Sequence, residues 1–231
     1  MSAEASGLLA HWKLDESAGT SAEDSAGSNT GTLSNGPVWQ SAGGVTKGAL
    51  DFDGADDLVG AGSAAAVDDI AALTISAWIY PRTAGELSNA WIIGKATGTN
   101  IATSGWLFSL SNDETRTIKF SVEYSSSHIE HTGVANVITL NAWNHVVVTW
   151  NGTTAAGNNH IYVNNAEISY GYTDNGSGSR VSDAASNISI GNNPATSRTF
   201  DGLIDDVRIY NYALTADQVK EVMNYGSIYI K

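Results

Sequence analysis

The chain has 231 residues, a length that suits one all-β domain, and 42% of them are hydrophobic, which is enough to bury a core. Its formal net charge of −13 argues against nucleic acid and anionic membrane surfaces as partners, because both select clustered Lys and Arg. There is no cysteine, so disulfides, thiolate metal sites and a cysteine nucleophile are excluded. No apolar run is long enough to predict membrane insertion.

Short runs of alternating apolar and polar residues, separated by Asn-Gly, Gly-Gly and Ser-Gly turns, predict antiparallel strands with one buried face. The clearest run is 117–124, in which Ile118, Phe120 and Val122 share one face. In chain order, the predicted strands span residues 8–14, 49–52, 73–80, 91–95, 106–110, 117–124, 145–150, 160–163, 188–190 and 203–210.

Residues 216–223 carry the one firm helical pattern, because Thr215 and Gln218 before and within it are spaced as a capping box. A shorter helical turn is expected near residues 64–70. The fold class is therefore predicted as all-β, a two-sheet antiparallel β-sandwich with one short C-terminal helix. No linker divides the chain, so residues 1–231 are expected to form a single domain.

Asp205 is the residue that points most directly to a site. Regular alternation along 203–210 puts its side chain on the same face as Leu203 and Val207. An unpaired buried charge costs several kcal/mol, so this carboxylate needs a cation, an arginine or main-chain N–H groups. Hydrogen bonds from a neighbouring turn and ligation of a metal ion both meet that need.

The long segment 15–31 offers a partner for Asp205. It carries Asp24 and Asn29, whose side-chain oxygens are hard ligands that suit Ca²⁺, and ligation would order a segment that has no core of its own. The alternative is a solvated, mobile loop.

Several segments together resemble the laminin-G-like, concanavalin A-like modules of the lectin/glucanase superfamily. They are residues 7–19, 24–27, 31–33, 49–54, 73–79, 143–148 and 200–212, in that family's order. The resemblance implies a jelly roll with a structural calcium ion between an early Asp-Ser-Gly loop and a late Gly-x-Ile-Asp strand. It implies Asp24, Asn29 and Asp205 as the metal ligands. At Asp206 the chain departs from the family, which usually has Glu there.

Carbohydrate binding needs aromatic rings for the apolar faces of sugars and polar side chains for their hydroxyls, and seven Trp and nine Tyr supply the rings. Trp residues within the family-like strands are assigned to packing. The ligand candidates lie in the less family-like middle of the chain and are Trp91, Trp106, Tyr124, His128, His131, Tyr170 and Tyr172. For each of them ordinary packing is an equal alternative. His128 and His131 fall on opposite faces of an extended segment, which disfavours a zinc pair.

Motifs typical of enzymes are absent: no Glu-x-Asp-x-Glu strand, Gly-x-Ser-x-Gly elbow or His-Glu-x-x-His helix occurs. The sequence therefore predicts no enzyme, but a non-catalytic, lectin-like module of a secreted protein that binds a polysaccharide or glycan and a calcium ion. An enzyme domain of the same parent chain is a second candidate partner. A protein–protein adhesion module and a polysaccharide-cleaving enzyme are the alternatives. The first residues lack the pattern of a signal peptide, so export would depend on a segment outside this sequence.

Overall fold

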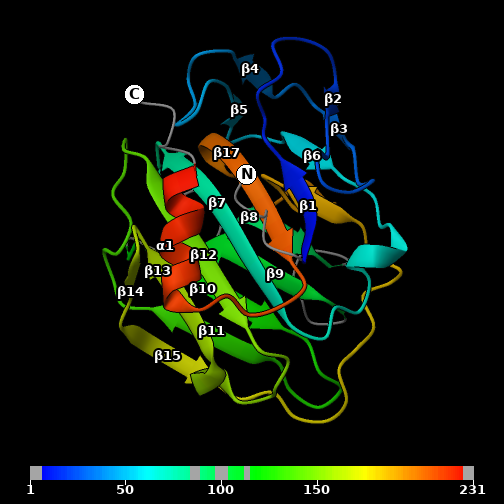
Figure 1. Cartoon of the computed structure of the whole chain (residues 1–231), viewed down its shortest axis with the longest axis vertical. Coiled ribbons are helices and arrows are strands. Elements are labelled where there is room, and N and C mark those ends of the chain that lie inside the picture. Colours follow the sequence, from blue (N-terminus) through cyan, green and yellow to red (C-terminus); the bar gives the residue numbers. More distant parts are fainter. Residues whose placement is uncertain (1–6, 84–88, 97–103, 112–114, 226–231) are drawn as a thin grey trace.

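The structure, a computed structural model, describes residues 7–83, 89–96, 104–111 and 115–225. In this part of the chain, two antiparallel sheets pack face to face and one short helix lies against the outside of one of them (Figure 1). The predicted β-sandwich with a single short helix is confirmed. The ends of the predicted domain, 1–6 and 226–231, lie outside the described residues. No described helix has the length and hydropathy needed to cross a bilayer.

The eight-stranded sheet has the order β14-β13-β12-β7-β17-β5-β4, with β1 paired to the last residues of β17. Its strands are β1 (Leu8–Trp12), β4 (Val38–Gln40), β5 (Ala49–Asp53), β7 (Leu73–Pro81), β12 (Asn144–Trp150), β13 (Asn159–Val163), β14 (Ala166–Glu167) and β17 (Asp201–Tyr210). β17, near the C-terminus, therefore lies between strands from the first third of the chain.

The nine-stranded sheet has the order β15-β11-β10-β9-β8-β16-β6-β3-β2. Its strands are β2 (Ser21–Ala22), β3 (Gly31–Ser34), β6 (Leu58–Gly60), β8 (Ala90–Lys95), β9 (Trp106–Leu110), β10 (Ile118–Val122), β11 (Ile129–Gly133), β15 (Tyr170–Asp174) and β16 (Ile188–Ile190). The expected turn near 64–70 is a 3-10 helix at Ala65–Val67, and a second 3-10 helix spans Ala156–Asn158.

A single large apolar cluster fills the space between the sheets. Alternate residues of each strand supply it, as for Ile118, Phe120 and Val122 of β10, because successive side chains of a strand point to opposite faces. Trp12 and Trp150 are also fully buried there. Burying a large apolar side chain contributes about 1.5–3 kcal/mol, so this cluster is the main source of stability.

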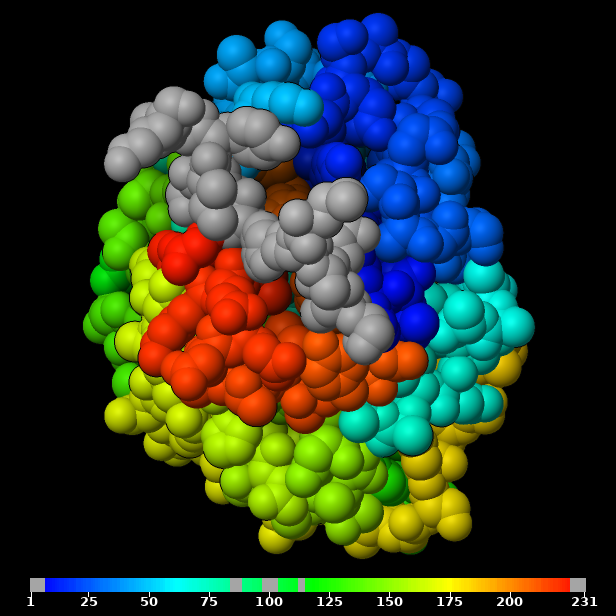
Figure 2. Space-filling view, in the orientation of Figure 1, coloured from blue at the N-terminus to red at the C-terminus, as the bar shows by residue number. Residues whose placement is uncertain are grey.

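Helix α1 (Ala216–Tyr225) packs on the outer face of the eight-stranded sheet. Its Val219 and Val222 contact Val147 and Tyr162 of that sheet in a second apolar cluster. In Figure 2 the helix and the segment before it, in red and orange, lie across this face of the molecule. The predicted capping box is present, because Gln218 N donates to Thr215 Oγ1 and Thr215 N donates to Gln218 Oε1.

The alternation predicted along β17 is wrong in one respect. The register of β17 shifts between Asp205 and Arg208, and Asp206 has a positive φ of 52°. This bulge changes the parity of the strand, so Ile204 and Val207 both face the core while Leu203 is only partly buried on the other face. Asp205 is fully buried as expected, but it does not share the face of Val207.

Candidate functional site

Asp24 is held by main-chain N–H groups. Its Oδ1 accepts from His11 N at 2.9 Å, Ala26 N at 3.1 Å and Gly27 N at 2.9 Å, and its Oδ2 accepts from Asn29 N at 3.0 Å. Burial raises the pKa of Asp24, but these four bonds together outweigh it and leave the pKa below its usual value. The carboxylate therefore closes the turn that contains it.

The side chain of Asn29 has partners of its own. Its Nδ2 lies 3.4 Å from Asp24 Oδ2, and its Oδ1 accepts from Ala64 N at 2.9 Å. The Asn29 carbonyl accepts from Trp12 Nε1 at 2.8 Å. Asn29 thus joins the early loop to β1 and to residue 64.

The structure does not bring Asp24 and Asn29 together with Asp205. Trp12 of β1 forms a bridge with Asp24 on one side and pairs with Val207 of β17 on the other, so β1 lies between the early loop and β17. Neighbouring strands are about 4.8 Å apart, so two strand spacings separate Asp24 from β17. The three predicted ligands do not form one site.

Asp205 lies against a different loop, residues 43–48. Its Oδ2 accepts from Val45 N at 2.8 Å and Thr46 N at 3.4 Å, while its buried Oδ1 has no partner. Burial raises the pKa of Asp205 to about 8, and the nearby carboxylates of Asp206 and Asp15 add to the effect. Hydrogen bonds from a turn, one of the two predicted ways to compensate this carboxylate, therefore satisfy only half of it.

Loop 43–48 fits closely over Asp205. A Cβ on Gly44 would lie 2.7 Å from Asp205 Oδ2 and 1.7 Å from the Gly48 carbonyl, so only glycine fits at position 44. Gly48 N donates to Asp15 Oδ1 at 3.0 Å, which brings a second carboxylate to the same loop. Two carboxylates, one of them with a free buried oxygen, suit a hard divalent cation such as Ca²⁺. The chemistry of these donors therefore fits the ion that the family resemblance implies, although the second carboxylate at this loop is Asp15 and not Asp24.

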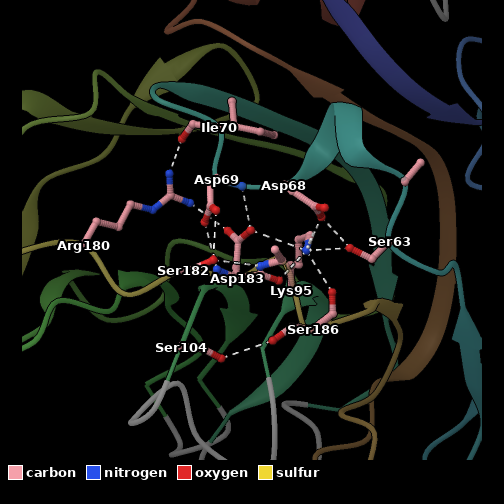
Figure 3. Close-up of polar contacts among 12 residues, drawn as sticks. Ser63, Asp68, Asp69, Ile70, Lys95, Ser104, Arg180, Ser182, Asp183 and Ser186 are labelled. Atoms are coloured by element: carbon pink, nitrogen blue, oxygen red, sulfur yellow. Dashed lines mark hydrogen bonds and ion pairs between the residues drawn. The ribbon is translucent and has the colours of Figure 1, made fainter.

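A buried lysine that sequence reasoning missed joins two other loops (Figure 3). The Lys95 side chain is fully buried, and its Nζ donates to Ser63 Oγ and to the carbonyls of Asp183 and Ser186. It also lies 2.9 Å from Asp68 Oδ1 and 3.4 Å from Asp183 Oδ1. An ammonium group has three donors, so none is left for a ligand, and the arrangement is structural. Its only sequence signal is a Lys at the end of an apolar strand.

Most of the predicted ligand residues lie inside the sandwich. Trp106 and Tyr124 belong to the main core, whereas Trp91 is fully buried in a separate small cluster with Leu107, on the same face of the nine-stranded sheet as Ser109. His131 is 1% exposed and stacks on half-buried Tyr170 with ring centroids 3.6 Å apart. These five residues serve packing, the alternative weighed for each of them.

His128 and Tyr172 lie on the outer face of the nine-stranded sheet, where Tyr172 is exposed and His128 is partly exposed. The Tyr172 side chain is 53% exposed and pairs with Thr132 across β15 and β11. It is the only aromatic among the large exposed apolar side chains of the described residues. Residues sharing this face form the β11–β15 patch, which comprises Lys119, His128, Glu130, Thr132, Tyr172 and Asp174. As expected, His131 points to the opposite face from His128.

The β11–β15 patch is polar and mostly paired within itself. Glu130 Oε2 lies 2.8 Å from Lys119 Nζ and 3.4 Å from His128 Nε2, and Tyr172 Oη lies 3.5 Å from Asp174 Oδ2. An exposed aromatic ring surrounded by charged and hydroxyl groups is suited to stacking on a sugar ring while bonding its hydroxyls.

Next to this patch, the same face continues with less accessible polar groups. Ser109, Ser121 and Glu123 follow Lys119 across β9 and β10, and each has a buried side-chain oxygen with no partner. Burial raises the pKa of Glu123, while His128 acts weakly in the opposite direction.

A cavity of about 290 Å³ lies on the other side of the molecule, between the eight-stranded sheet and the start of α1. Asn151, Asn158, His160 and Tyr162 are among its lining residues. None of the predicted ligand residues lines it, so it is a separate place where a small polar ligand would fit.

Comparison with known proteins identifies the relatives of this chain. Adhesion G-protein coupled receptor V1 of Danio rerio is 27% identical over 158 residues, which are 67% of this chain and 2% of that protein. The binding domain of Paraclostridial Mosquitocidal Protein 1 has a TM-score of 0.67 at 16% identity, over 95% of this chain and 52% of that one. This chain therefore spans a small part of the curated relative and about half of the toxin domain.

A third relative is domain 4 of AbnA, an extracellular arabinanase from Geobacillus stearothermophilus, whose structure contains arabinotriose. It has a TM-score of 0.58 at 18% identity and covers 94% of this chain and 98% of that domain. At these identities the likeness to solved structures concerns the fold. The family described as the concanavalin A-like lectin/glucanases superfamily matches residues 52–220, which is most of the chain. The chain belongs to the concanavalin A-like lectin/glucanases superfamily.

Proposed function

We propose that the chain is a non-catalytic carbohydrate-binding module of an extracellular protein, and that it holds a glycan against the β11–β15 patch. The observation that carries the proposal is the exposed Tyr172 ring on a sheet face that also presents His128, Thr132 and Asp174. The arabinotriose in the related arabinanase domain supports a carbohydrate ligand, and an enzyme as the rest of the parent chain.

The proposal that the chain is not catalytic rests on the three carboxylates of that face. Glycoside hydrolysis needs one carboxylic acid and one carboxylate on either side of the scissile bond. Glu130 is engaged by Lys119 and His128, the Oε2 of Glu123 is buried, and Asp174 lies beside the hydroxyl of Tyr172. A polysaccharide-cleaving enzyme on this fold would be revealed by products released from a polysaccharide by the isolated chain.

We also infer that a calcium ion binds at Asp205 and Asp15. The support is the free buried oxygen of Asp205 and its raised pKa, since a divalent ion would neutralise both carboxylates there. Such an ion supplies positive charge and ties loop 43–48 to β17. In this proposal Asp24 and Asn29 close the early loop and are not ligands.

The test of glycan binding is an array of polysaccharides and oligosaccharides, probed with the calcium-loaded chain. Tyr172→Ala should weaken any binding about tenfold or more, because it removes the stacking ring, while Tyr172→Phe should keep most of it. His160→Ala is the control, since it alters the cavity on the other side of the molecule.

If the folded wild-type chain bound none of the glycans on the array, the proposed function would be overturned. If His160→Ala lost glycan binding and Tyr172→Ala kept it, the glycan would bind in the cavity and not on the β11–β15 patch.

A protein–protein adhesion module is the second candidate, favoured by the relative named as an adhesion receptor. Saturable binding to a purified extracellular protein, insensitive to Tyr172→Ala and to competing sugars, would support it over glycan binding.

A further inference from the structure

Three aspartates cluster in the turn between β5 and β6, away from the site at Asp205. Asp53 is the last residue of β5, and Asp56 and Asp57 directly precede β6. One carboxylate oxygen from each lies within 4.8 Å of the other two. Calcium binds oxygen at about 2.3–2.6 Å, so two ligands of one ion are at most about 5 Å apart. The three carboxylates therefore have the spacing of ligands around a single ion.

Asp57 provides a separate indication of a ligand. The residue is 3% exposed, its Oδ2 accepts from Asp53 N at 2.9 Å, and its buried Oδ1 has no hydrogen-bond partner. Buried polar atoms in folded proteins nearly always have a partner, and a buried carboxylate oxygen without one is costly. An atom that accepts no hydrogen bond and is closed to bulk water is free to bind a cation.

The charges at this turn are not balanced by the protein. None of the ion pairs among the described residues includes Asp53, Asp56 or Asp57. Three like charges this close destabilise the turn unless a positive charge joins them.

The turn is also fixed from outside the cluster. Asn35 Nδ2 donates to the Asp56 carbonyl at 2.9 Å, and Thr199 Oγ1 donates to the Gly54 carbonyl at 2.8 Å. A Cβ on Gly54, whose φ is +79°, would lie 2.9 Å from Asp201 Cβ, so the turn has little room to rearrange. A cation would thus enter a largely formed site.

We propose that Asp53, Asp56 and Asp57 bind a second calcium ion. All three side chains offer oxygen and none offers nitrogen or sulfur, which favours Ca²⁺ or Mg²⁺ over zinc and copper. An irregular turn of consecutive residues suits the variable geometry of Ca²⁺ better than the octahedral geometry that Mg²⁺ demands. Because β5 belongs to the eight-stranded sheet and β6 to the nine-stranded sheet, the ion stabilises the link between the two layers.

The experiment is calorimetric titration of the metal-free chain with CaCl₂ in five forms: wild type, Asp205→Asn, Asp57→Asn, the double variant that combines these two, and Asp217→Asn. Asp205→Asn should still bind one calcium ion, and adding Asp57→Asn to it should abolish that binding. In the wild-type background Asp57→Asn should remove one bound ion. Asp217→Asn, which alters an exposed carboxylate on α1, should leave binding unchanged.

A substitution at an exposed ligand tests the site without disturbing a buried residue, so that a loss of binding is not confused with misfolding. Asp56 is exposed, so Asp56→Asn should fold like the wild type and weaken the second binding event about tenfold or more. Unchanged calcium binding in Asp56→Asn and Asp57→Asn would overturn the proposal, and so would equal affinity for MgCl₂. If these variants bind calcium like the wild type, only the second calcium site is contradicted. The glycan site at Tyr172 is tested in a separate experiment, so its result does not depend on this one.

Discussion

The carboxylate of Asp205 accepts a hydrogen bond at 2.8 Å from the main-chain nitrogen of Val45, 160 residues earlier in the chain. This contact places an early loop over the last long strand, and it leaves the second oxygen of Asp205 buried without a partner. A calcium ion at that oxygen would join loop 43–48, from the early part of the chain, to β17 near its end. The same bond shows that the late carboxylate is held by loop 43–48 and not by the loop that contains Asp24.

Calcium at Asp205 should be visible in thermal unfolding. Binding at about 100 times Kd stabilises by about 2.7 kcal/mol, which is roughly 5–10 °C in Tm for a domain of this size. A chelator should therefore lower the Tm of the wild type. Asp205→Asn should show a smaller response, because only the second proposed site, at Asp53, Asp56 and Asp57, remains for the chelator to empty, whereas Asp206→Asn should respond like the wild type. Equal melting of the wild type with and without chelator would contradict calcium at this site.

Asp24 should matter for stability in a different way. Its carboxylate accepts four main-chain N–H groups, so Asp24→Ala leaves them without their partner and should cost about 1–3 kcal/mol in the free energy of unfolding. Asp24→Asn keeps one acceptor oxygen and should cost less. Urea unfolding with and without calcium measures both. If Asp24→Ala lowered the free energy of unfolding only in the presence of calcium, Asp24 would be a calcium ligand after all.

The sequence was sufficient for the architecture because period-two alternation is a local signal. The predicted strands at 73–80, 106–110 and 203–210 correspond to β7, β9 and β17, and the predicted helix corresponds to α1. Strands with little apolar alternation were missed. β15, for example, is exposed along most of its length and pairs only at the edge of its sheet, so its residues carry no buried face to detect.

The candidate site was less predictable, because it depends on tertiary pairing. Nothing local in the sequence indicates the bulge at Asp206, which reverses the parity of β17. Loop 43–48 was not expected to approach Asp205, since the two are far apart in the chain. The aromatic candidates share only a position in the less family-like middle of the chain, and that position does not distinguish buried Trp106 from exposed Tyr172.

The buried lysine should be one of the most sensitive positions in the protein. Lys95→Met keeps much of the side-chain volume but leaves the carboxylate of Asp68 without its cation and Asp183 with Arg180 alone, so it should cost about 3–5 kcal/mol. Lys119→Met is a matched control, because Lys119 pairs with Glu130 at the surface and should contribute less than about 1 kcal/mol. Chemical unfolding of both variants compares them. Similar stability of the two would show that the Lys95 pairs are not structural.

His131 should make the fold sensitive to acid. Burial lowers the pKa of His131 to about 4, below its ordinary value of 6.5, so at intermediate pH the unfolded chain binds a proton that the folded chain does not. The stability that depends on neutral His131 is therefore complete above pH 6.5 and is lost as the pH falls toward 4, by about 2–3 kcal/mol. His145, whose pKa burial lowers to about 3, acts in the same direction. His131→Phe keeps a ring against Tyr170 and should reduce the slope of unfolding free energy between pH 4 and 6.5, whereas His128→Phe, at a partly exposed position on the outer face, should change it less. Identical slopes in the wild type and His131→Phe would mean that His131 is protonated as easily in the folded chain as in the unfolded one.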